Sequence, residues 1–229
     1  TIIRDTSFVN ETSEWVLSGP HFFLANPFNK TPNRDCNSNL AYSQINLEAL
    51  PDKFLPRTNY LPNKDRDEYI KRLQKVGWIE GDKEKPKSVS NYYRLVNREM
   101  IGSSSERTLN TAIIPTNASH IYTMLGSAFL NNEKLIEFAS FTFSLPMDFH
   151  LKSMGVGHAN VNVMEQVLTL GKDVSFFTQK YLFSRVLTLN CLTSHYNDLW
   201  LELYDFAFKK CLWSIEDRRL DSGFWLNLS

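Results

Sequence analysis

Two runs of apolar and β-branched residues in the middle of the chain are typical of β-strands. They are Tyr92–Val96 and Thr108–Ile114, and the Ser-rich segment Gly102–Glu106 lies between them. In a strand, successive side chains point to opposite faces, so Tyr92 and Tyr93 are expected to face opposite sides of a sheet. We therefore expect a pair of strands joined by a polar loop.

Shorter runs predict further strands in the N-terminal part of the chain. Trp15–Leu17 and His21–Leu24 flank a Gly-Pro pair that is typical of a turn, and Tyr42–Leu47 is a third short run. Three prolines fall within Pro51–Pro62. Because proline restricts its own backbone and that of the preceding residue, this segment is predicted to be a stiff loop.

Helical spacing of apolar residues predicts the remaining elements. It occurs in Ala118–Phe129, in Asn131–Leu145 and over most of Phe176–Trp213, with an interruption near residues 193–196. Asp65–Lys75 is predicted to be a charged, exposed helix, and Ser153–Asn162 a loop.

Strands and helices follow one another without a regular βαβ rhythm, which predicts an α+β fold. We expect a recognition domain of mixed strands over residues 15–171. A mainly helical segment over residues 172–229 is expected to follow it and to continue into a longer polypeptide.

Charge and cysteine content narrow the classes of function. The chain has 25 Lys or Arg and 25 Asp or Glu, so it lacks the basic excess of a small autonomous DNA-binding domain. Between residues 49 and 110, however, thirteen Lys or Arg face nine Asp or Glu, an excess of four, which predicts either a basic surface or an ordinary face of mixed charge. Three widely spaced cysteines do not form a zinc motif and suit a reducing cytoplasm. No apolar run is long enough for a membrane helix.

The sequence contains no complete catalytic motif. Asn26-Pro27-Phe28-Asn29 resembles part of the Asn-Pro-Pro-Tyr motif of amino-methyltransferases, but it lacks the second proline and is interpreted as a turn. Gly155-Val-Gly157 is too short for a dinucleotide fingerprint. We therefore expect this chain not to be an enzyme by itself and to hold no cofactor or metal.

The stretch from Tyr92 to Met100, followed by Glu106-Arg-Thr-Leu-Asn-Thr-Ala-Ile-Ile-Pro115, resembles TaqI-like specificity domains. These domains follow the catalytic domain in class I N6-adenine DNA methyltransferases and in type IIG restriction–modification enzymes. The resemblance implies that this chain recognises double-stranded DNA. It also implies that a catalytic methyltransferase domain of the same polypeptide flips an adenine and methylates it with S-adenosylmethionine.

The polar residues of the predicted loops are the candidate DNA contacts. Base or groove contacts are predicted for Arg98, Arg107, Asn160 and Asn162, and phosphate contacts for Lys30, Arg57 and Lys87. For the two arginines of the first group, an ion pair with Glu99 or Glu106 is the structural alternative.

Two other functions stay open from the sequence. One is a protein-interaction module of the same defence system, with the helices from Phe176 onward docking another subunit. The other is an enzyme with an unrecognised active site, which predicts a deep pocket with perturbed carboxylates or histidines.

Overall fold

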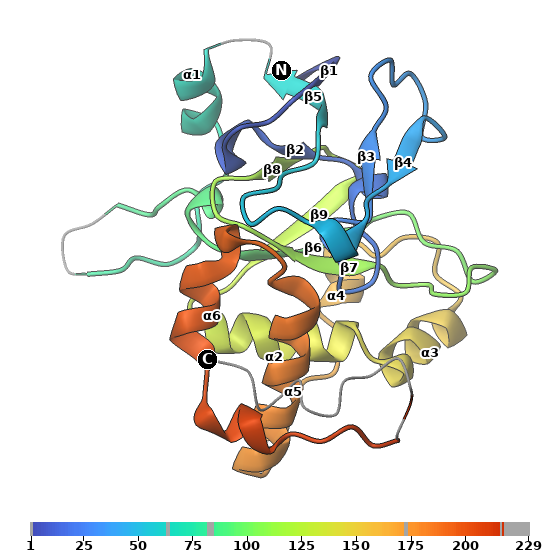
Figure 1. The fold of residues 1–229 in the computed structure, drawn as a ribbon, viewed down its shortest axis with the longest axis vertical. Coiled ribbons are helices and arrows are strands. Elements are labelled where there is room, and N and C mark those ends of the chain that lie inside the picture. Colours follow the sequence, from blue (N-terminus) through green and yellow to red (C-terminus); the bar gives the residue numbers. More distant parts are fainter. Residues whose placement is uncertain (1, 63–64, 82–84, 172–173, 216, 218–229) are drawn as a thin grey trace.

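The computed structural model has the expected α+β fold, with helices and both parallel and antiparallel strand pairs (Figure 1). It describes residues 2–62, 65–81, 85–171, 174–215 and 217. A central sheet lies in the middle of the molecule, with most of the helices on one side of it and the short strand pairs, together with one short helix, on the other (Figure 1). No helix among the described residues is both long and apolar enough to cross a membrane.

The central sheet has three antiparallel strands in the order β7-β6-β9. They are β6 (Arg94–Arg98), β7 (Thr111–Ile114) and β9 (Met124–Ala128). Val96 in the middle strand pairs with Ala112 on one side and with Gly126 on the other. The two strands predicted from Tyr92–Val96 and Thr108–Ile114 are thus confirmed, each beginning two or three residues later than expected.

The helix predicted for Ala118–Phe129 is wrong. This segment contains β8 (Ser119–His120), a turn and β9. Its apolar residues suited either structure, but a helix would leave the second edge of β6 without a partner. Pairing over the whole length of β6 stabilises the strand more than the helical spacing of apolar residues stabilises a helix, and Gly126 is a poor helix former.

Three two-stranded pairs, counted over the described residues, lie beside the central sheet. Strand β1 (Ile2–Ser7) is antiparallel to β5 (Thr58–Pro62), and β3 (Lys30–Pro32) is antiparallel to β4 (Tyr42–Gln44). Strand β2 (Val16–Leu17) is parallel to β8.

Two segments of this part of the chain differ from the structure expected for them. The end of the predicted stiff loop, Thr58–Pro62, is strand β5, and Pro62 lies at its last position, where proline is tolerated. The strand expected for His21–Leu24 is absent. Gly19–His21 instead forms the 3-10 helix η2, because Pro20 fixes a turn that the ring nitrogen of His21 closes by accepting from the Ser18 N–H.

Side-chain caps explain where the helices begin. The helices are α1 (Arg66–Lys71), α2 (Asn132–Thr142), α3 (Leu145–Met154), α4 (Val161–Met164), α5 (Phe176–Asn190) and α6 (Asn197–Leu203). Asn131 caps α2 and Ser144 caps α3. The helix expected over 131–145 is confirmed as α2, which ends at Thr142, whereas α3, which begins at Leu145, was not predicted. Ser175 caps α5.

Short 3-10 helices join several of these elements: η1 (Thr12–Glu14), η3 (Leu47–Ala49), η4 (Val89–Asn91), η5 (Ser194–Tyr196) and η6 (Phe206–Lys210). The expected break in the C-terminal helical segment is confirmed. It occurs between α5 and α6, where η5 lies. In the predicted loop Ser153–Asn162, the first residues still belong to α3 and the last two to α4.

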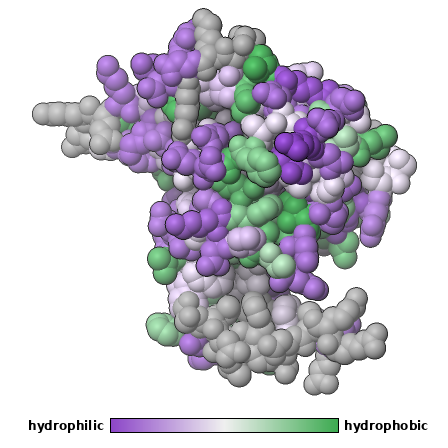
Figure 2. Space-filling model, turned by 45° about the horizontal axis from the view of Figure 1, so that its top comes forward, coloured by the Kyte–Doolittle hydropathy of each residue, from purple (hydrophilic) through white to green (hydrophobic). Residues whose placement is uncertain are grey.

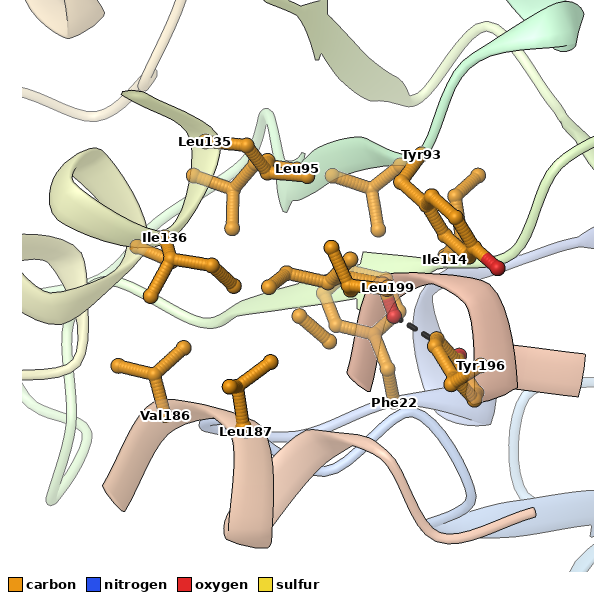
Figure 3. Packing of buried hydrophobic residues seen from close by; sticks show 14 of the residues in the cluster. Phe22, Tyr93, Leu95, Ile114, Leu135, Ile136, Val186, Leu187, Tyr196 and Leu199 are labelled. Atoms are coloured by element: carbon orange, nitrogen blue, oxygen red, sulfur yellow. Dashed lines mark hydrogen bonds between the residues drawn. The ribbon is translucent and has the colours of Figure 1, made fainter. Parts of the chain in front are cut away.

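One hydrophobic core spans the boundary that was expected near residue 171. Val186 and Leu187 of α5 point toward Leu135 and Ile136 of α2, and Leu95 of β6 belongs to the same cluster (Figure 3). Lys172 and residues 218–229 lie outside the described residues. Helices α5 and α6 therefore do not have a core separate from that of residues 15–171.

Asn190 at the end of α5 completes the outer edge of the central sheet. Its Oδ1 accepts from the Ile113 N–H at 2.7 Å, and its Nδ2 donates to the Ile113 carbonyl at 2.8 Å. The Tyr196 hydroxyl donates to the same carbonyl at 2.9 Å. A side-chain amide thus replaces the neighbouring strand that an edge strand lacks.

Candidate nucleic-acid interface

The structure brings together the two loops in which DNA contacts were predicted. Met100 and His158 form an antiparallel bridge, the Ile101 N–H donates to the Gly157 carbonyl at 3.1 Å, and the Ala159 N–H donates to the Glu99 carbonyl at 2.7 Å. We call residues 99–106 and 155–162 the paired loops. They lie together on the right of the molecule in Figure 1, beside α3 and α4.

Buried hydrogen bonds hold the paired loops to the rigid part of the fold. Nδ2 of Asn97, which is 1% exposed, donates to the Ala159 carbonyl at 2.8 Å. Asp148 of α3 accepts from the backbone N–H groups of Thr108 and Leu109 at 2.7 and 3.0 Å. The Lys152 ammonium donates to the Ser105 carbonyl at 2.9 Å. The loops are therefore preorganised rather than dependent on a ligand for their shape.

Arg107 is a structural residue and not an exposed base reader. Its guanidinium donates to the carbonyls of Phe143 and Ser144 at 3.0 and 3.2 Å, at the junction of α2 and α3. Its Nε lies 3.6 Å from the Asp148 carboxylate, and its side chain is only 12% exposed. The alternative of an ion pair was right in kind, but the acidic partner is Asp148 and not Glu106.

Arg98 also points inward. Its Nε donates to the Gly19 carbonyl at 2.9 Å and its Nη2 to the Phe22 carbonyl, while the guanidinium lies 5.4 Å from the centre of the Phe22 ring. Burial lowers the pKa of this guanidinium from its usual value. The predicted base contact is thus contradicted, because the donors of Arg98 already hold the 19–22 segment against the central sheet.

The two predicted asparagines are exposed at the paired loops. Asn160 caps α4 by accepting from the Val163 N–H at 3.2 Å, which leaves its Nδ2 without a partner among the described residues. Asn162 uses its backbone carbonyl to accept from Gln166, and no hydrogen bond to its side-chain amide occurs in the described part of the chain. Met100 is 73% exposed, and His158 lies exposed beside it. The surface thus offers amide, imidazole and thioether groups, together with the carboxylates of Glu99 and Glu106.

The predicted phosphate contacts do not form one group. Lys30 begins β3, and Arg57 lies next to it, with its Nε donating to the Pro32 carbonyl at 2.7 Å. Lys87 forms an ion pair with Glu80 at 2.8 Å. The segment that contains Lys87 lies on the left of Figure 1, whereas the paired loops and β3 lie on the right, so Lys87 does not belong to the same surface.

Sequence reasoning missed the residues that fix the site. Asp148 lies in an ordinary helical stretch, and its two acceptor bonds reach residues 39 and 40 positions away. No local pattern marks such a contact. The exposed side chains of Met100 and His158 were also missed, although their place in Gly- and Ser-containing loops was a usable signal.

Metal or acid–base chemistry has little support in the described residues. No group of three His, Cys, Asp or Glu side chains with the spacing of a metal site occurs among them. His21 has a pKa lowered by burial to about 4, but both ring nitrogens are bonded within the core. His120 also has a pKa lowered by burial and lies against the central sheet. Neither histidine lies beside a carboxylate in the described structure.

The chain matches no protein-family model, no curated protein and no solved structure. The resemblance to TaqI-like specificity domains stays a prediction from the residues that carry it.

Proposed function

We propose that this chain is the DNA-recognition module of an adenine-N6 DNA methyltransferase or methyltransferase–endonuclease, and that the paired loops contact the bases. The observation that supports this best is that two polar loops, far apart in sequence, pair with each other. Buried hydrogen bonds from Asn97 and Asp148 hold this region to the core of the fold. Rigid loops with exposed amides suit base reading, because Asn forms a bidentate contact with adenine N6 and N7.

The charges at the paired loops suggest which domain contacts the bases and which contacts the phosphates. Glu99, Glu106 and Glu165 lie at or near the paired loops, where Lys152 is the nearest cation on α3. Phosphate contacts are therefore assigned mainly to a catalytic domain of the same polypeptide, which would also bind S-adenosylmethionine. Lys30 and Arg57 are the proposed phosphate contacts of this chain.

The test is selection from a randomised DNA duplex library by the full-length methyltransferase. Asn160→Asp keeps the oxygen that caps α4 and removes the amide donor, and Asn162→Ala removes the other amide. We expect each change to relax the selected sequence at one or two positions, with a loss of about 1–3 kcal/mol for the cognate site. The matched control is Asn91→Ala, an exposed amide on η4.

Selection of an identical sequence with unchanged affinity by both loop variants would remove the paired loops from the proposal. Failure of the unaltered protein to select any sequence would count against DNA recognition as a whole.

A protein-binding role has one observation in its favour. A cavity of about 280 Å³ between α2, α3 and α5 is lined almost wholly by apolar atoms, including Phe141, Met147 and Leu182. Leu145 and Phe149 of α3 are 70% and 73% exposed. Figure 2, which shows the molecule turned from the view of Figure 1, also shows a hydrophobic strip between hydrophilic areas of the surface. Under this role, Phe149→Ser would disrupt an assembly and leave DNA selection unchanged.

A further inference from the structure

A second cavity, of about 470 Å³, lies where α5 gives way to α6. One wall is the loop that follows η3, which contributes Asp52. The other wall is the break between the two helices and the first turns of α6, which contribute Cys191, Thr193, Asn197 and Trp200. We call this cavity the Trp200 pocket. Its volume lies within the range of pockets that hold small organic groups.

The two walls are fixed to each other. The Ser194 N–H and hydroxyl both donate to the Asp52 carbonyl, at 2.7 and 2.9 Å, although the residues are 142 positions apart. Tyr196 is fully buried beneath the pocket, and its hydroxyl is bonded to the Ile113 carbonyl of β7 (Figure 3). The pocket is therefore built onto the main core and does not depend on a mobile surface loop.

Three polar side chains of the Trp200 pocket, those of Asp52, Thr193 and Asn197, have no partner within the described chain. The Asp52 carboxylate is exposed and makes no ion pair there, and the Asn197 amide makes no hydrogen bond there. The hydroxyl of Thr193 has no partner either, although this residue is only 8% exposed.

The electrostatic character of the pocket is negative and aromatic. Among the described residues that line it, Asp52 is the only charged one. Trp200 also lines the pocket, and its ring is stacked on that of Tyr204 with ring centres 6.1 Å apart. Asp198 and Glu202 of α6 add negative charge near the pocket. Burial is the main cause that raises the pKa of the neighbouring Tyr93 to about 12, and these two carboxylates raise it further. Lys53 is adjacent in sequence but does not line the pocket.

We propose that the Trp200 pocket binds a guanidinium group, as presented by an arginine side chain. A carboxylate accepts two parallel hydrogen bonds from guanidinium, and an indole attracts the cation through its π face. The Asn197 oxygen supplies a further acceptor for the remaining N–H groups. The guanidinium comes either from a segment of a partner polypeptide or from a free small molecule. This assignment does not depend on DNA recognition.

The test uses the full chain and a blocked arginine, N-acetyl-L-arginine methylamide, titrated while amide and indole NMR signals are recorded. The matched ligand is the corresponding citrulline derivative, which has nearly the same shape and no charge. We expect the arginine derivative to shift the Trp200 indole signal saturably, and the citrulline derivative to bind at least about 10-fold more weakly, because hydrogen bonds to charged groups are the stronger ones.

Two variants locate the site. Asp52→Asn is expected to weaken binding of the arginine derivative by about 10-fold, and Trp200→Leu by about 3-fold, from loss of the charge and of the aromatic face respectively. The control is Glu48→Gln, an exposed carboxylate on η3 outside the pocket, which should change binding by less than about 2-fold. The exposed Asp52 side chain makes no hydrogen bond or ion pair to the described residues, so we expect its replacement to leave the fold intact.

Comparison of free arginine with arginine inside a blocked pentapeptide distinguishes a guanidinium group of a partner polypeptide from that of a free small molecule. Tighter binding of the peptide indicates a partner polypeptide, and equal or tighter binding of the free amino acid indicates a small molecule. Absence of saturable binding, equal binding of the citrulline derivative, or equal loss in Glu48→Gln and Asp52→Asn would overturn the proposal.

Discussion

Protonation of His21 should make the free energy of unfolding strongly dependent on pH. The ring is fully buried between η2 and β5. Its Nδ1 accepts from the Ser18 N–H at 2.9 Å, and its Nε2–H donates to the Arg57 carbonyl at 2.8 Å. Both bonds fit the neutral ring. A second ring proton would point at an N–H donor, so the folded protein favours the neutral form.

The size of the effect follows from the two pKa values. Burial lowers the pKa of His21 from 6.5 to about 4 in the folded protein, and the nearby backbone carbonyls of Arg57 and Ser18 offset only part of that shift. Between these values the unfolded chain binds a proton that the folded chain does not. Stability is therefore full above about pH 7 and falls as the pH drops toward 4. From pH 7.5 to pH 5.0 the expected loss is about 2 kcal/mol. His120, whose pKa is also lowered by burial, contributes with the same sign.

Urea unfolding at pH 7.5 and pH 5.0 measures this loss, and the His21→Gln variant removes the titrating ring. His21→Gln is expected to be less stable at pH 7.5, but its stability should fall by about 2 kcal/mol less between the two pH values. His150→Gln, on α3, serves as the matched control and should keep the dependence of the unaltered chain. An equal fall in the unaltered chain and in His21→Gln would refute the reasoning.

Three further substitutions test the packing that positions the candidate sites, each by urea unfolding. Gly126→Ala places a Cβ 2.6 Å from Nε2 of His120 and should cost about 1–3 kcal/mol, which His120→Ala should largely restore in the double variant. Asp148→Ala leaves two buried backbone N–H groups without an acceptor and should cost about 2–4 kcal/mol. Asn190→Ala should cost about 1–3 kcal/mol, because the Ile113 N–H loses its acceptor while the carbonyl keeps the tyrosine hydroxyl.

Each of these variants has a control of the same residue type. Gly77→Ala meets nothing within 4 Å, and Asp35→Asn and Asn91→Ala alter exposed side chains. All three should change the free energy of unfolding by less than about 0.5 kcal/mol. If a control variant lost as much stability as the variant it is matched to, the contact proposed for that variant would not be the cause of the loss.

Elements with a strong local pattern were predicted well from the sequence. Strands β6 and β7 and helix α5 have apolar residues at the spacing of their own structure, so local preference and packing agree. Strand β9 was mistaken for a helix, because its structure depends on pairing with β6, about thirty residues earlier. Short apolar segments that complete a sheet cannot be distinguished from helices by spacing alone.

The candidate contacts were predicted less well, for a related reason. The sequence shows that Arg98 and Arg107 flank a polar loop, but it does not show that backbone carbonyls of distant segments accept their hydrogen bonds. Asn160 and Asn162 were placed correctly at an exposed surface, because glycine near them predicts a surface turn. The Trp200 pocket had no signal in the sequence, since its two walls are about 140 residues apart.

The arginines that point inward also change the interpretation of the basic excess between residues 49 and 110. Of the thirteen Lys and Arg between residues 49 and 110, Arg94, Arg98 and Arg107 donate hydrogen bonds to backbone carbonyls inside the fold. That leaves ten cations for nine carboxylates, so the apparent basic excess of this region is mostly internal. A region whose remaining charges are so nearly balanced supplies little of the counterion release that drives non-specific DNA binding. If this chain recognises DNA, neutral groups such as those of the paired loops must therefore supply the sequence preference, and another domain most of the affinity.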